Sequence, residues 1–437
     1  MIGVALAVYG AFPDAEAMAG TEPIRGASSA GRGDHADAQR TAAPGVSRSM
    51  VVLLAAAVGA AVANRYYIEP LLSLVAGKLR VSDTAAGLLV TCAQVGYVLG
   101  LALLVPLGDL AERRRLITIM LLGAGVAAAA CAAAPGLFAL ASALVVLGLC
   151  SVAAQILIPF AADLAAEHER GRVVGSVTSG LLIGILAART VAGLAADVGG
   201  FRLTFALAAA VMITFAVILC RVLPSTPTVE RRGYWALLGS VVELVAAEPV
   251  LRQRMILGLL QMAGFAVLWT PSAFLLSGPP YHYRTVTIGL FGLVGAAGVS
   301  CAPAAGRLAD RGHGRLVLTG CLVITLVSWA LLALGRTSLV ALVAGIVLLD
   351  LGAQAAQVNH QSAIYALGPG VRSRLNAAYM VTFCLGGVLG SLTAATVYGV
   401  AGWTGTCLLG AGIAATALVV WLSTQRIGSR AHQARRN

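Results

Sequence analysis

Four ionisable side chains stand inside otherwise apolar stretches of this chain, namely Arg65, Glu69, Arg189 and Asp350. Each such group costs about 2.5–3.5 kcal/mol at the centre of a membrane-spanning helix, so its retention indicates a function. Arg65 and Glu69 are four residues apart, and they could neutralise each other on one helical face. Arg189 and Asp350 have no such neighbour, so each requires a partner or water from elsewhere in the fold.

A polar stripe begins at Asp350. Steps of four, three and four residues place three glutamines on the same helical face, at Gln354, Gln357 and Gln361. Such a face is unfavourable against lipid, so it either lines a central cavity or makes hydrogen bonds between helices. Further candidates for the cavity wall are Asn64, Tyr66, Tyr67, Gln155, Gln261, Trp269, Asn376 and Tyr379.

The composition explains which environment these residues occupy. The chain has 437 residues, of which 59% are hydrophobic and 11% charged, with a mean hydropathy of +0.89. Soluble domains are about 45–50% apolar and about 25% charged, so an ordinary soluble enzyme is excluded. The net charge of +12 comes almost wholly from arginines scattered between apolar runs. No compact basic domain exists, so we expect no nucleic-acid partner.

Twelve apolar runs are long enough for transmembrane helices. They are 50–76, 84–107, 116–134, 137–161, 173–195, 203–221, 254–277, 286–306, 316–335, 338–366, 375–400 and 404–424. The runs are continuous rather than alternating, which excludes a membrane β-barrel. Basic residues fall mostly in the two tails and in those loops that twelve crossings place on the same side of the membrane as the tails. Because cytoplasmic loops carry an excess of Lys and Arg, both termini are predicted to be cytoplasmic in the inner (plasma) membrane.

The longest polar gap divides the runs six and six. The predicted parts are a tail over 1–49, a six-helix bundle over 50–221, a cytoplasmic linker over 222–253, a second bundle over 254–424 and a basic cytoplasmic tail over 425–437. The N-terminal tail is either disordered or precedes a true start at Met50. Within the linker, residues 233–248 are weakly amphipathic and could lie along the membrane surface.

The same loop motif occurs once in each predicted bundle. Gly108-Asp109-Leu-Ala-Glu112-Arg113 follows the second run, and Gly306-Arg-Leu-Ala-Asp310-Arg311 follows the eighth run, 198 residues later. The acid and the arginine of each copy could form a latch at the cytoplasmic face, or the loop could be a solvated turn. Gln155 and Gln357 are 202 residues apart. These offsets predict a duplicated unit whose halves are related by an axis along the membrane normal.

The doubled G-x-L-A-[DE]-R loop resembles the loop motif of the major facilitator superfamily. The stretch from Asn64 to Leu72 is similar to the N-x-Y-Y-x-x-P-L-L segment of a bacterial branch that includes drug–proton antiporters and purine-nucleoside and sugar efflux proteins. The resemblance covers 50–424 and implies an all-α membrane protein with twelve helices in two pseudo-symmetric bundles, acting as a monomer. Glu112 replaces the usual aspartate, and the fifth run lacks the G-P…G-G signature of classical antiporters.

These features predict a secondary active transporter rather than an enzyme. The chain has no G-x-x-x-x-G-K-[ST] loop for ATP and no paired cysteines for a metal, so we expect no cofactor. We expect proton-coupled efflux of a drug-like, nucleoside-like or natural-product molecule, with Asp350, Glu69 and Arg189 handling the proton. An importer or facilitative uniporter of a small polar solute is the alternative within transport. A membrane sensor or receptor is the alternative outside it.

Overall fold

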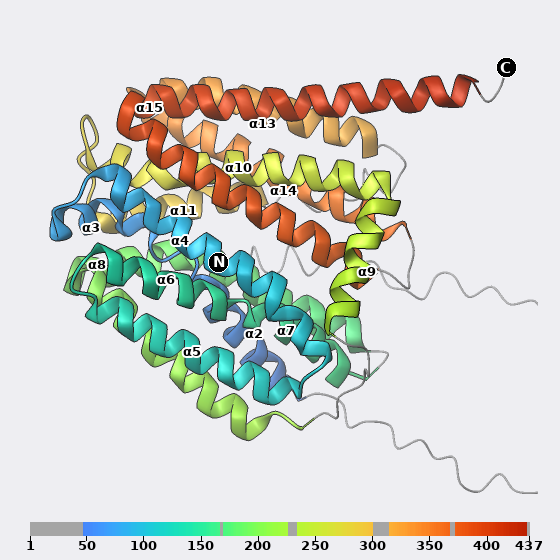
Figure 1. The fold of residues 1–437 in the computed structure, drawn as a ribbon. Coiled ribbons are helices and arrows are strands. Elements are labelled where there is room, and N and C mark those ends of the chain that lie inside the picture. Colours follow the sequence, from blue (N-terminus) through green and yellow to red (C-terminus); the bar gives the residue numbers. More distant parts are fainter. Residues whose placement is uncertain (1–46, 167–168, 226–233, 300–313, 368–371, 435–437) are drawn as a thin grey trace, which may run out of the picture.

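The computed structural model describes residues 47–166, 169–225, 234–299, 314–367 and 372–434, and within these ranges all regular elements are helices. The N-terminal half contains α2 (Arg48–Ala63), α3 (Leu72–Leu79), α4 (Asp83–Leu103), α5 (Arg113–Ala133), α6 (Leu137–Ser151), α7 (Ala153–Leu164) and α8 (Arg170–Val222). The C-terminal half contains α10 (Pro249–Ser277), α11 (Thr285–Val299), α13 (Gly314–Leu334), α14 (Leu339–Tyr365) and α15 (Arg372–Ala434). The halves form two facing layers, and α9 (Tyr234–Ala247) runs across one end of both (Figure 1).

The helices account for the twelve predicted crossings. Eight helices in the described part of the chain are long and apolar enough to span a bilayer, when α6 and α7 are counted as one span over Leu137–Leu164. Two of them, α8 and α15, are each two spans joined at a sharp turn, at Gly200 (φ 71°) and at Gly402 (φ 59°). Glycine suits both turns because positive φ carries no Cβ penalty there. The shorter apolar helices α2 and α11 supply the remaining two crossings.

The first span is interrupted. Helix α2 ends at Ala63, a run of turns covers 64–68, and a 3₁₀ turn, η2 (Glu69–Leu71), leads into α3. Pro70 explains the break, because proline lacks an N–H and disfavours helical backbone before it. The continuous helix expected over 50–76 is therefore wrong, and with it the helical spacing that would have paired Arg65 with Glu69.

The tails and the linker differ from the prediction in small ways. Helix α2 begins at Arg48, inside the predicted tail, and residues 1–46 lie outside the described part. Helix α15 continues to Ala434, so the last helix extends well into the segment expected to be a basic tail. Helix α9 occupies the stretch predicted to be amphipathic, and the Tyr234 hydroxyl donates to the carbonyl of Leu103 at 3.1 Å.

The two halves meet directly at one end of the molecule, which we call the closed end. Thr91 of α4 is hydrogen-bonded to Ser391 of α15 at 3.0 Å, and Arg284 forms an ion pair with Asp197 at 2.6 Å. A Cβ on Gly289 of α11 would collide with the backbone carbonyl of Arg189 in α8. Such close backbone approach between small residues is the usual basis of helix packing in membranes.

At the other end, the same helices separate. The last turns of α4 and the first turns of α15 form opposite walls of a cavity there. We call this the loop-motif end, because Gly108 and Arg113 lie at it. The interface is thus tight at one end and open at the other.

Candidate substrate cavity

A cavity of about 410 Å³ lies between the halves. Its walls come from the turn after α2 and from α4, α7 and α8 on one side, and from α10, α14 and α15 on the other. The polar and aromatic residues that line it are Arg65, Tyr66, Tyr97, Gln155, Thr178, Gln261, Phe265, Gln354, Gln357, Gln361, Asn376 and Phe383. The volume suits a small organic molecule, since ligand pockets are commonly about 300–1,000 Å³.

A second cavity of about 490 Å³ extends from the first toward the loop-motif end. Gln155, Asn376 and Met380 line both cavities, so the two adjoin. The second cavity is bounded by Gly108 and Arg113 at its outer rim. Together they give the central space an approach from the loop-motif end.

A buried ion pair lies where the cavity meets the closed end. Nε of Arg189 donates to Oε2 of Glu69 at 2.7 Å, and both side chains are only 5% exposed. The guanidinium of Arg189 also lies over the ring of Trp269, 4.0 Å from its centroid, and 5.1 Å from the ring centroid of Tyr66. Glu69 therefore pairs with a residue 120 positions away, and not with Arg65 as its sequence spacing suggested.

Asp350 lies beside this ion pair. It is 4% exposed and lines a recess of about 40 Å³ together with Arg189, Phe265 and Gln354. Because Arg189 lines the same recess, its positive charge acts on the carboxylate of Asp350 as well as on that of Glu69. Oδ1 of Asp350 has no hydrogen-bond partner among the described residues. One arginine thus serves two carboxylates.

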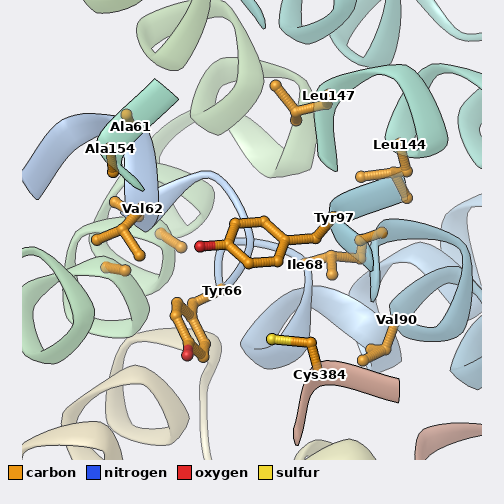
Figure 2. Packing of buried hydrophobic residues seen from close by; sticks show 14 of the residues in the cluster. Ala61, Val62, Tyr66, Ile68, Val90, Tyr97, Leu144, Leu147, Ala154 and Cys384 are labelled. Atoms are coloured by element: carbon orange, nitrogen blue, oxygen red, sulfur yellow. The ribbon is translucent and has the colours of Figure 1, made fainter. Parts of the chain in front are cut away.

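Arg65 lies apart from those carboxylates and contacts aromatic rings. Its guanidinium is 4.6 Å from the ring centroid of Tyr97 and 5.6 Å from that of Tyr66, and Nη1 donates to Sγ of Cys384 at 3.7 Å. Figure 2 shows Tyr66, Tyr97 and Cys384 converging from three separate segments. None of the ion pairs among the described residues includes Arg65.

The glutamines surround the middle of the cavity. Gln354, Gln357 and Gln361 lie along its α14 wall, one helical face as the spacing predicted. Gln155 donates to the hydroxyl of Tyr97 at 3.2 Å, and Gln261 donates to the carbonyl of Ala353 at 2.5 Å. These amides offer several donors and acceptors to a polar ligand.

Four predicted wall residues lie elsewhere. Tyr379 is fully buried, with its ring beside those of His360 and Phe383, and does not line the cavity. The structure buries Asn64 behind the cavity, where neither side-chain polar atom has a partner in the described part of the chain. Tyr67 is partly buried in the same turn and does not line the cavity. Trp269 contributes its ring to Arg189 rather than to the wall. Asn376 lines both cavities and accepts from Tyr365 at 3.1 Å.

Comparison with known proteins identifies the family. A family model described as Major Facilitator Superfamily matches residues 54–335 and 291–436. The chain belongs to the major facilitator superfamily. It is similar to the uncharacterized transporter YgaY of Escherichia coli, with 45% identity over 376 residues that cover 86% of this chain and 95% of that protein. It is also similar to a Streptomyces coelicolor protein named "Probable transporter", with 32% identity over 83% of this chain and 84% of that protein.

Solved structures of superfamily members share the fold. A bacterial homologue of the human lysosomal transporter Spinster, in an inward-facing and unoccupied conformation, superposes with a TM-score of 0.70 at 13% identity, over 86% of this chain and 96% of that chain. The nucleoside transporter NupG superposes with a TM-score of 0.69 at 15% identity, over 85% and 99% of the two chains. The predicted superfamily and its twelve-helix architecture are therefore confirmed, and the chain is a multi-pass membrane transporter.

The superfamily loop is described in its first copy. Nε of Arg113 donates to the carbonyl of Gly108 at 2.9 Å, and Nη1 contacts Asp163 at the end of α7 at 2.5 Å. Arg113 thus joins the loop to α7, while Glu112 precedes α5 without a capping hydrogen bond from its side chain. The side chain of Asp109 and the whole second copy, with Gly306, Asp310 and Arg311, lie outside the described residues.

The sequence did not indicate three residues near the arginines of the site, namely Tyr97, Gln94 and Phe265. Gln94 of α4 is 1% exposed, and its Oε1 and Nη2 of Arg65 lie 3.3 and 3.4 Å from the position that a Cβ on Gly387 would occupy. Phe265 of α10 lies 6.0 Å from the guanidinium of Arg189, measured to its ring centroid. A lone amide inside an apolar span was a usable signal for Gln94. Phe265 carried no signal, because an apolar aromatic residue in a span is most often simple packing.

Proposed function

We propose that this transporter exports a small organic molecule from the cytoplasm across the inner membrane in exchange for protons. It would act by alternating access, with the two halves rocking about the central cavity. The single observation that carries the proposal is the set formed by Glu69, Arg189 and Asp350, in which two buried carboxylates share one arginine. This set has one negative charge in excess, and a proton can neutralise it.

Asp350 is the better proton carrier of the two acids. Glu69 already has a short, direct ion pair with Arg189, whereas Asp350 lines the recess and its Oδ1 has no hydrogen-bond partner among the described residues. A proton on Asp350 would leave the pair between Glu69 and Arg189 balanced. Loss of that proton would return a negative charge to the cavity, where it could attract cargo.

The shape of the interface supports loading from the loop-motif end. Both large cavities lead to that end, which the arginine distribution predicts to be cytoplasmic. Cargo would enter there and bind while Asp350 is ionised. After the halves rock, a proton from the far side would replace the cargo on Asp350 and return with the carrier.

Proteoliposomes test this proposal. Purified protein should transport nucleosides or lipophilic drugs from a test panel faster when a pH gradient is imposed, and collapse of that gradient should abolish the stimulation. Asp350→Asn should lose the stimulation while still exchanging labelled for unlabelled cargo. The exposed acid Asp83, at the start of α4, gives the matched control Asp83→Asn, which should retain it. Full gradient-driven transport by Asp350→Asn would remove Asp350 from the mechanism, and indifference of the wild type to the gradient would indicate a uniporter.

A further inference from the structure

The charges around the cavity form two separate poles. The acid pole consists of Glu69, Arg189 and Asp350 and carries one excess negative charge. The basic pole consists of Arg65 alone, which forms no ion pair with a carboxylate among the described residues. Both poles border the same connected space, because Phe265 and Gln354 line both the recess and the main cavity.

Arg65 is a buried cation without a carboxylate partner among the described residues. Its side chain is 5% exposed, and Nε and Nη2 have no hydrogen-bond partner among the described residues. Oε1 of Gln94, which like Nη2 lies close to the position that a Cβ on Gly387 would occupy, has none either. A buried charge without a partner is costly, so an anionic group that accepts from this guanidinium would be strongly stabilised.

The anion that fits one arginine carries one charge. A carboxylate matches the planar fork of a guanidinium with two parallel hydrogen bonds. A phosphate monoester carries about 1.5 to 2 negative charges, which a single cation leaves uncompensated. The basic pole therefore favours a carboxylate over a phosphate.

The acid pole has the opposite requirement. Its excess negative charge favours a cation, and the recess of about 40 Å³ beside Asp350 has room for a group the size of an ammonium. Besides its glutamines, the wall of the main cavity has apolar residues, with Met262, Met380 and Phe383 among them. A ligand that reaches both poles must pass along this wall.

From this arrangement we propose that the cargo is an amphipathic zwitterion, with a carboxylate held by Arg65 and an ammonium that takes the place of the proton on Asp350. The inference rests on the proposed proton exchange and names its substrate class. A simple anion would bind best when Asp350 is protonated and would travel with the proton. An ammonium competes with the proton for the same carboxylate, which is what exchange requires.

A matched set of ligands tests both poles. Binding to the purified protein in lipid nanodiscs would be measured by calorimetry for aminohexanoate, aminooctanoate and aminodecanoate. Each amino acid is compared with three analogues of the same chain length: one that keeps only the carboxylate, one that keeps only the amine, and one in which the carboxylate is an amide. Because the zwitterion makes one more charged contact than either singly charged analogue, the best zwitterion should bind at least about tenfold more tightly than either. Equal binding of the carboxylate or the amine at every chain length would overturn the proposal.

Three variants locate the contacts. Arg65→Gln should abolish the advantage of the zwitterion over the amine, and Asp350→Asn should abolish its advantage over the carboxylate. Arg65→Lys keeps the charge but loses the fork, so it should retain only part of the preference. Arg65→Gln removes an unpaired buried charge, so its melting temperature should not fall. Preferences unchanged in Arg65→Gln would also overturn the proposal.

The control is an arginine away from the cavity. Arg254 of α10 is partly buried against Trp421 and does not line the cavities, so Arg254→Gln should keep the full preference. Because these are equilibrium measurements without a gradient, they stand apart from the transport assay. If the protein prefers the zwitterion but shows no gradient-driven transport, only the proposed function is contradicted. If it transports other cargo in response to the gradient and lacks this preference, only the proposal of a zwitterionic cargo is contradicted.

Discussion

The two ends of the interface between the halves use the same helices in opposite ways. At the closed end, α4 and α15 are joined through Thr91 and Ser391, and α8 and α11 meet at Gly289 with almost no space between their backbones. At the loop-motif end, α4 and α15 form opposite walls of a cavity of about 490 Å³. The difference shows that small side chains let the helices close tightly at one end, which we call the seal. The buried charges lie where seal and cavity meet.

The largest expected effect comes from that boundary. Arg189→Gln leaves Glu69 and Asp350 buried without their shared cation, and we expect a loss of about 3–5 kcal/mol in unfolding free energy. Chemical unfolding in detergent measures this loss. The double variant Glu69→Gln with Arg189→Gln should recover part of the lost stability, because it removes one of the two carboxylates that Arg189→Gln leaves without a cation. A mild effect of Arg189→Gln alone would mean that the ion pair contributes little.

A smaller effect is expected from filling the seal. Gly289→Val places a side chain against the carbonyl of Arg189, and overpacking of this kind typically costs about 1–3 kcal/mol. Since the contact joins the two halves, they should separate at the closed end rather than unfold. A cysteine introduced at Ser391 should then react faster with an impermeant maleimide. Gly239→Val in α9, where a Cβ meets nothing within 4 Å, is the control that should leave labelling unchanged.

The hydrogen bond across the seal should contribute less. Thr91→Val together with Ser391→Ala removes it without adding bulk, and such bonds in membranes average about 0.6 kcal/mol. The population open at the closed end should rise about two- to threefold, as distance measurements between spin labels on α4 and α15 would report. No change in the distance distribution would mean that glycine packing alone holds the seal.

The smallest effect is expected at the loop-motif end. The ion pair of Arg113 with Asp163 is partly exposed, and exposed pairs contribute about 0.2–1 kcal/mol. Arg113→Gln should therefore shift the balance between the two ends slightly, with little change in melting temperature. Arg172→Gln breaks an ion pair within one helical turn and should not shift that balance. A shift as large as that of Gly289→Val would give the loop a larger role than its exposure predicts.

Sequence alone was sufficient for the architecture. Apolar runs, arginine-rich loops and the repeated G-x-L-A-[DE]-R pattern predict twelve helices in two halves, because the bilayer imposes a fixed length and polarity on every span. The stripe from Gln354 to Gln361 was equally readable, since helical periodicity decides which residues share a face.

The partners of the charges were not predictable in this way. Spacing paired Glu69 with Arg65, but Pro70 interrupts the helix, and the true partner, Arg189, is distant in sequence. The aromatic contacts of Arg65 with Tyr97 likewise depend on which helices pack together. Periodicity describes one helix at a time and carries no information about such tertiary neighbours.

The interrupted first span also has a consequence for biosynthesis. The chain enters the membrane from its N-terminus, so Glu69 is inserted 120 residues before the arginine that neutralises it. Until the fifth span is made, the first carries an acid that costs about 2.5–3.5 kcal/mol at the bilayer centre. Nascent chains that stop before Arg189 should therefore hold their first span loosely, and completion of the fifth span should fix it in place.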